Sequence, residues 1–153
     1  MLKKEKKFII ILTSIFTVIV IAIAIALIIL LKPKEINEII CQYKTDKDNQ
    51  YINIIKYTEN DDFTLIIDNV KYNKEYSHNF EKAGIHKVIF EFKDKLVSLE
   101  GFFEGNQYLI NADFSGLKTE KIKSMANLFQ DCIKLDNITF NIETPNLENI
   151  YVL

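Results

Sequence analysis

The longest apolar stretch of the chain runs from Phe8 to Leu31 and contains no charged residue. A helix of that length rises about 36 Å, enough to cross a hydrocarbon core of about 30 Å. Its small residues Ala22, Ala24 and Ala26 lie inside the stretch, whereas a cleavable signal peptide has its cleavage site after the apolar region. The pattern therefore predicts an uncleaved transmembrane helix over residues 8–31 that contacts the lipid bilayer.

Lysines flank this apolar stretch unequally. Residues 1–7 carry four lysines and one glutamate, whereas only Lys32 and Lys34 follow closely behind it. The more basic flank of a membrane helix normally faces the cytosol. We therefore expect a single-pass protein with a cytosolic basic tail at residues 1–7, a juxtamembrane linker at 32–40, and the remainder extracellular or lumenal.

Between residues 41 and 93, apolar and polar residues alternate with a period of two, which is typical of half-buried strands. The segments with this pattern are 51–57, 63–68, 70–72 and 85–92. Turn-forming residues lie between them at 46–49, 59–62, 68–69 and 83–84, and the pair Asp68 and Asn69 predicts a two-residue hairpin. We therefore expect a small β-sandwich-like module over residues 41–93.

Residues 94–153 contain a repeat. An offset of 26 residues aligns 95–120 with 121–146. Both copies show apolar positions at i, i+3, i+6 and i+7, a short helical stripe over 96–103 or 122–129, before a strand-like segment at 109–114 or 135–140. A third copy starts at an offset of 25, where Leu147, Ile150 and Leu153 take the apolar positions. Because units of this length cannot bury a core alone, the pattern predicts a solenoid of two units and a partial third.

The fold class predicted from these patterns is α+β: a transmembrane helix, a β-sandwich-like module and the start of a solenoid. The repeats resemble the BspA-type leucine-rich repeats of bacterial and protist surface proteins. The resemblance covers about residues 96–153 and is carried by 122–132, Leu135-x-x-Ile138-x-Phe140, the less complete copy at 96–103, and the preceding segment 84–90. In the first copy Asn106 stands where the family has cysteine. The resemblance implies a truncated array in a cell-surface recognition or adhesion protein, without catalysis or a cofactor.

The charge of the chain argues against nucleic acid as a partner. Residues 35–153 contain 13 lysines against 20 acidic residues, a formal charge of −7. Nucleic-acid binding requires a basic surface that neutralises phosphates. We therefore expect a protein or another surface ligand as the partner.

Candidate chemistry in the sequence is sparse. The two histidines, His78 in a turn-rich stretch and His86 on a strand's apolar face, lack further ligands at metal-site spacing. The stretch 46–50 resembles the start of a calcium loop, but the glycine and the glutamate that complete such a loop are missing. No catalytic motif is present. We expect no metal, no cofactor and no enzyme activity.

The cysteines leave two interpretations open. On an oxidising side of the membrane, Cys41 and Cys132 can form a disulfide. Alternatively, Cys132 takes the cysteine position of the repeat, which a stacked array buries as a small apolar residue.

The sequence favours a non-enzymatic recognition or adhesion protein. Its expected partner face consists of exposed strand residues: Asn111, Asp113, Asn137 and Thr139. Asn137 also begins a glycosylation sequon, usable only if this part enters a eukaryotic secretory lumen. Two alternatives stay open: a truncated or degenerate membrane-anchored structural protein, and an accessory subunit of a secretory-pathway membrane complex.

Overall fold

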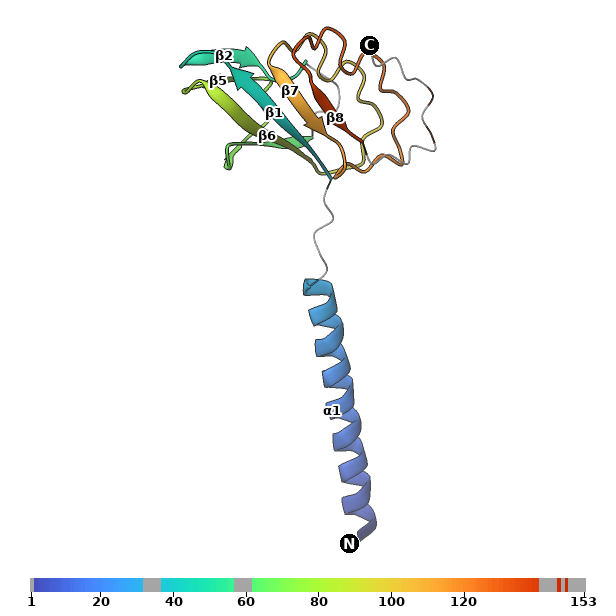
Figure 1. Cartoon of the computed structure of the whole chain (residues 1–153). Helices are drawn as coiled ribbons and strands as arrows, with labels where there is room; N and C mark the ends of the chain where they lie inside the picture. The colour runs from blue at the N-terminus through green and yellow to red at the C-terminus, as the bar shows by residue number, and fades with distance from the viewer. Residues whose placement is uncertain (1, 32–36, 57–61, 141–145, 147, 149–153) are drawn as a thin grey trace. The chain divides into compact units, whose positions relative to one another are not determined.

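The computed structural model describes residues 2–31, 37–56, 62–140, 146 and 148 (Figure 1). The chain divides into two compact units, Met1–Glu35 and Ile36–Leu153, which are considered separately. In the first unit, side chains are described from residue 15 onward. Three predicted features therefore lie outside the described residues: the side chains of the basic tail, residues 32–36 of the linker, and most of the third repeat copy.

The first unit contains the helix α1 (Leu2–Leu30). Its described side chains, Ile15 to Leu31, are predominantly apolar and exposed. Among the residues that the structure describes, no helix combines the length and hydropathy that a membrane crossing requires. This finding contradicts the predicted transmembrane helix at Phe8 to Leu31. It also corrects the predicted contact with the bilayer and the predicted single-pass localisation.

The second unit is built on a six-stranded mixed sheet with the order β4-β3-β6-β1-β7-β8. Strands β6, β1, β7 and β8 of this sheet are labelled in Figure 1. Its strands are β1 (Glu38–Thr45), β3 (Phe63–Ile67), β4 (Val70–Tyr72), β6 (Gly84–Phe92), β7 (Leu109–Asp113) and β8 (Asn137–Thr139). Strands β7 and β8 are parallel, and the other neighbours are antiparallel. Strands β2 (Gln50–Asn53) and β5 (Ser77–Phe80) form a separate antiparallel pair.

Strand β1 joins the two parts that the sequence predicted as separate modules. It pairs with β6 along its whole length on one side and with β7 on the other. Its first residues, Glu38 to Ile40, belong to the predicted linker. Because β1 places β6 and β7 in one sheet, the predicted β-sandwich-like module followed by a solenoid is wrong, and the described residues form a mostly β unit.

The Asp68-Asn69 hairpin between β3 and β4 is confirmed. Ile67 pairs directly with Val70, and the two intervening residues have φ angles of 47° and 70°. Two successive positive φ angles are those of the type I′ turn, which matches the right-handed twist of the flanking strands. Another predicted strand, at 51–57, is shorter than expected because β2 ends at Asn53, and most of the predicted 59–62 turn lies outside the described residues.

Residues that are 26 positions apart lie side by side in the carboxyl-terminal part. Asn111 pairs with Asn137 and Asp113 with Thr139, and a parallel bridge joins Ser98 to Ser124. In the third copy, the N–H of Glu148 donates to the carbonyl of Lys123 at 2.9 Å, as the N–H of Lys123 donates to Val97 at 2.8 Å. The described copies therefore stack through equivalent backbone hydrogen bonds.

The predicted helical stripes at 96–103 and 122–129 are turns. Hydrogen bonds from one N–H to the carbonyl three residues earlier recur at equivalent positions, such as Phe102 to Leu99 and Leu128 to Met125. Left-handed residues recur with the same spacing: Gly101 with Asn127, and Gly105 with Asp131. A left-handed residue every four positions prevents a continuous α-helix, because a right-handed helix needs negative φ throughout.

One aromatic cluster forms the centre of the shared core. Its rings contact one another in a continuous chain from β3 to the segment after β8: Phe63, Phe90, Phe92, Phe102, Phe103, Phe114, Phe129 and Phe140. All except Phe140 are buried. The strands and the stacked turns therefore depend on the same hydrophobic burial, the main driving force for folding.

Candidate functional site

The four predicted partner-face residues lie together on the sheet. Asn111 and Asp113 of β7 stand directly beside Asn137 and Thr139 of β8. Ala112, between the first two, is fully buried, and successive strand side chains point to opposite faces. The four polar side chains therefore form a compact block on the sheet face that points away from the core.

Isoleucines continue this face across the sheet. Asp113 pairs with Ile40 of β1, Ile40 with Ile89 of β6, and Ile89 with Ile66 of β3. All three isoleucines are partly exposed. The row ends at Lys71 of β4, which pairs with Ile66. The sequence did not indicate this row, because Ile40 lies in the unpredicted strand β1 and strand pairing is not encoded in local periodicity.

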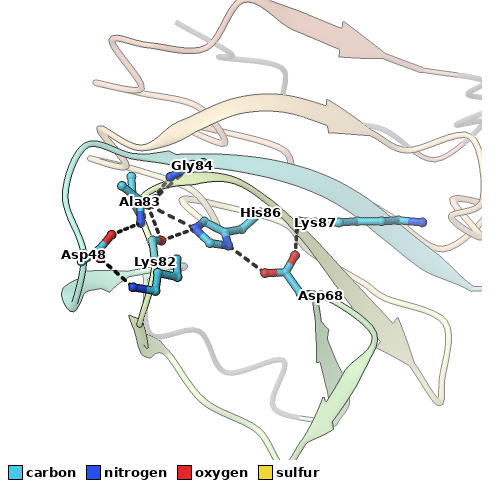
Figure 2. A network of polar contacts seen from close by, with 8 residues as sticks. Asp48, Asp68, Lys82, Ala83, Gly84, His86 and Lys87 are labelled. Carbon is cyan, nitrogen blue, oxygen red and sulfur yellow. Dashed lines mark hydrogen bonds and ion pairs between the residues drawn. The ribbon is translucent and has the colours of Figure 1, made fainter.

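A second candidate is the polar network around His86, on the core side of β6 (Figure 2). The ring Nδ1 lies 2.7 Å from Oδ2 of Asp68, and Nε2 lies 2.9 Å from the carbonyl oxygen of Lys82 and 3.1 Å from Oγ1 of Thr45. The tautomer of the ring decides which contacts it donates: Nε2 either donates to the Lys82 carbonyl or accepts from the Thr45 hydroxyl, and Nδ1 can donate to the Asp68 carboxylate.

Two aspartates extend this network to the backbone. Oδ1 of Asp68 accepts the N–H of Lys87 at 2.9 Å, and Oδ1 of Asp48 accepts the N–H of Ala83 at 2.9 Å (Figure 2). The Ala83 bond, followed by the Lys82 ammonium at 2.9 Å, lowers the pKa of Asp48. The network thus fastens the start of β6 to two neighbouring turns, which is a structural role.

The predicted turn at 46–49 is present, and its carboxylates are engaged by lysines. Oδ2 of Asp46 accepts Nζ of Lys134 at 2.9 Å, and this bond lowers the pKa of Asp46. Oε1 of Gln50 accepts the N–H groups of Asp46 and Lys47. Among the described side chains, no group of three or more His, Cys, Asp or Glu residues is placed to hold a metal ion.

A third candidate is a shallow hollow at β5. His78 lies in this strand rather than in a turn-rich stretch, and its ring packs edge-on between the rings of Tyr72 and Phe80, each 4.9 Å away. Its Nδ1 lies 3.2 Å from Oε2 of Glu75. The hollow has a volume of about 540 Å³ and is lined by Tyr51, Glu75, Tyr76, Ser77, His78 and Asn79.

Both cysteines are free thiols, so the disulfide alternative is not realised. Cys41 is fully buried in β1, and burial, with a smaller contribution from Asp113, raises its pKa well above the usual range. Cys132 donates from Sγ to the carbonyl of Phe103 at 3.0 Å, and partial burial raises its pKa as well. Reactive cysteines have lowered pKa values, so neither thiol has the character of a nucleophile.

No protein-family model, curated protein or solved structure matches the chain.

Proposed function

We propose that the chain is a non-enzymatic recognition module that binds a protein partner through the outer face of its six-stranded sheet. The observation that carries this proposal is the row of Ile40, Ile89 and Ile66 beside the polar block on β7 and β8. Protein interfaces typically have an apolar centre and a polar rim. This face has that arrangement on a rigid scaffold of paired strands.

The charges at the edge of the face support a protein as the partner. Lys71 and Asp113 stand at opposite ends of the isoleucine row, and Nζ of Lys71 lies 4.0 Å from Oε2 of Glu91. A face for a polyanion such as nucleic acid would be uniformly basic. Interspersed charges of both signs instead favour a partner with complementary charges of its own, which gives specificity.

The environments of the potential catalytic groups support a non-enzymatic role. Both ring nitrogens of His86 contact oxygen atoms within the fold, and the ring is buried. Burial also raises the pKa values of both thiols. A catalytic base or nucleophile must instead reach its substrate with a suitably tuned pKa.

The relationship to BspA-type leucine-rich repeats also remains our proposal, restricted to the repeat unit. It is supported by the 26-residue register between Asn111 and Asn137 and by the equivalent left-handed residues in the two copies.

Site-specific crosslinking tests the proposed partner face. A photoreactive residue replaces Gln42, which is exposed on β1 between Lys87 and Asn111. In the cells that produce the protein, we expect a discrete adduct with another protein, and we expect Ile89→Lys to abolish it. The matched control is Ile133→Lys, at an exposed isoleucine outside the strands, which should leave the adduct intact.

Three results would contradict this function. They are the absence of an adduct from position 42, an adduct that persists in the Ile89→Lys variant, and an adduct made of two copies of the chain. The first is the result expected of a structural protein that binds nothing.

A further inference from the structure

The residues that line the hollow on the β2–β5 pair differ in kind from those of the strand core and of the proposed partner face. Its six lining residues include two tyrosines, a serine, an asparagine, a histidine and a glutamate, and no aliphatic side chain or lysine. Its volume is about 540 Å³ and it is wide open to solvent, so a ligand would be covered on one side only. The lining therefore combines flat aromatic surface with both donors and acceptors of hydrogen bonds.

We propose that this hollow binds an uncharged carbohydrate of one or two sugar units. A sugar ring presents polarised C–H bonds on its face and hydroxyl groups along its edge. The negative face of a phenol ring attracts the C–H bonds, and side-chain amides and hydroxyls can both donate to and accept from the sugar hydroxyls. Tyr51 and Asn79 supply this combination, because they are directly opposite each other in the β2–β5 register and both are exposed.

The site is partly fixed before a ligand arrives. His78 holds Glu75 from the core side of β5, because its ring packs between Tyr72 and Phe80 and its Nδ1 contacts Oε2 of Glu75. Oγ of Ser77 donates to Oδ1 of Asn53 at 2.7 Å, so the serine oxygen is oriented as an acceptor. Groups locked by such supporting contacts bind with a smaller loss of conformational entropy.

The charges around the hollow argue against an ionic ligand. An anion would meet the carboxylate of Glu75, and the neighbouring cation, Nζ of Lys74, lies over the ring of Tyr76 at 5.3 Å instead. A cation would have to compete with His78 for Glu75, whose Oε2 already lies 3.2 Å from Nδ1. The remaining lining groups are neutral, which favours a neutral polyhydroxylated ligand.

The test is saturation-transfer-difference NMR on the full chain, dispersed in a detergent without a sugar head group because the described side chains of α1 are exposed and apolar. The probes are maltose, cellobiose, lactose and diacetylchitobiose, with choline chloride and a sulfated heparin disaccharide as charged comparisons. We expect transfer to at least one neutral disaccharide and to neither charged probe. Tyr51→Ala should weaken that binding about ten-fold, the loss expected for one aromatic contact.

Matched variants separate a binding role from a folding role. Tyr51 is 69% exposed, so its replacement should leave the fold intact, and Tyr51→Phe should retain most of the binding because the ring remains. Asn79→Ala should weaken binding, whereas Gln107→Ala, at an exposed side-chain amide in the turn before β7, should not. The proposal is overturned if no neutral disaccharide binds, if Tyr51→Ala binds like the unmodified chain, or if a charged probe occupies the site.

Discussion

Replacement of Phe103 by alanine tests whether the strands and the stacked turns share one core. The Phe103 ring is fully buried. Its centroid lies 5.8 Å from that of Phe90 on β6, 6.4 Å from that of Phe114 after β7, and 5.7 Å from that of Phe129 in the second repeat copy. The planes of Phe103 and Phe129 are nearly parallel, at 2°. One side chain thus connects the sheet with both described repeat copies.

The cost of this replacement follows from burial. A buried phenylalanine covers about 150–250 Å², worth about 4–6 kcal/mol at ~25 cal/mol per Å², and core Phe→Ala replacements cost about 3–5 kcal/mol. We therefore expect Phe103→Ala to lower the free energy of unfolding by about 4 kcal/mol, a large part of the about 5–15 kcal/mol of an ordinary domain. Phe140→Ala, at a ring that is 40% exposed, should cost less than about 2 kcal/mol.

Urea unfolding followed by near-ultraviolet circular dichroism measures this loss in the second unit specifically, because all seven tyrosines lie beyond α1. Hydrogen exchange should show β6 and residues 122–129 losing protection together in Phe103→Ala. If β6 keeps its full protection while 122–129 lose theirs, or if the loss is below about 1 kcal/mol, the shared-core argument is wrong.

Three further predictions concern single side chains. Asn69→Gly should stabilise the hairpin by a few tenths of a kcal/mol in urea unfolding, since φ is 70° there, and a loss of stability would contradict the turn assignment. With Ellman's reagent at pH 8, both thiols should react slowly in the native state and fast in urea, because burial raises both pKa values. Cys132 should react before Cys41, and the opposite order would refute this. The pKa of Asp48 is lower in the folded state, so its bonds stabilise the fold above about pH 4 and are lost as the pH falls through the folded pKa. Asp48→Asn should therefore have a lower free energy of unfolding than the unmodified chain at pH 6 and the same one near pH 2. An equal difference at both pH values would exclude this linkage.

The sequence predicted elements whose signals are local. Strand β6 alternates between buried and exposed residues over most of its length, with His86, Val88, Phe90 and Phe92 on the buried face as its pattern indicates. The Asp68-Asn69 turn was equally recognisable, since few residue pairs tolerate two left-handed positions. The placement of the four polar partner-face residues followed from the 26-residue repeat, because equivalent strand positions stack on the same face.

The central strand was missed because its local pattern is ambiguous. Ile39 and Ile40 are consecutive apolar residues, of which the first is buried in the core and the second lies on the outer face. Strand β5 was missed because Ser77, His78 and Asn79 are polar and only Phe80 is strongly apolar. Whether β1 pairs with β7 depends on contacts about 70 residues apart, which a period-two pattern does not specify.

The repeat copies show how backbone conformation can override side-chain spacing. Apolar residues at i, i+3, i+6 and i+7 suit one face of a helix, but they also suit successive turns that each bury one residue. Gly101 and Gly105 favoured the turns in the first copy, while Asn127 and Asp131 adopt the same left-handed conformation in the second. Asparagine and aspartate are the non-glycine residues that most readily do so, so this signal was present in the sequence although the apolar spacing masked it.

The two candidate binding surfaces are on different sheets, yet one pair of rings joins the sheets. The ring of Phe80 on β5 lies 4.3 Å from that of His86 on β6, and its other neighbour is His78, which lines the hollow. His86 is fixed by Asp68 and the Lys82 carbonyl. The next residue, Lys87, points to the opposite face of the sheet, where Gln42 and the isoleucine row lie. The ring of His86 therefore packs the two-stranded pair against the scaffold of the proposed partner face, which explains why a buried histidine without a catalytic arrangement stands at this position.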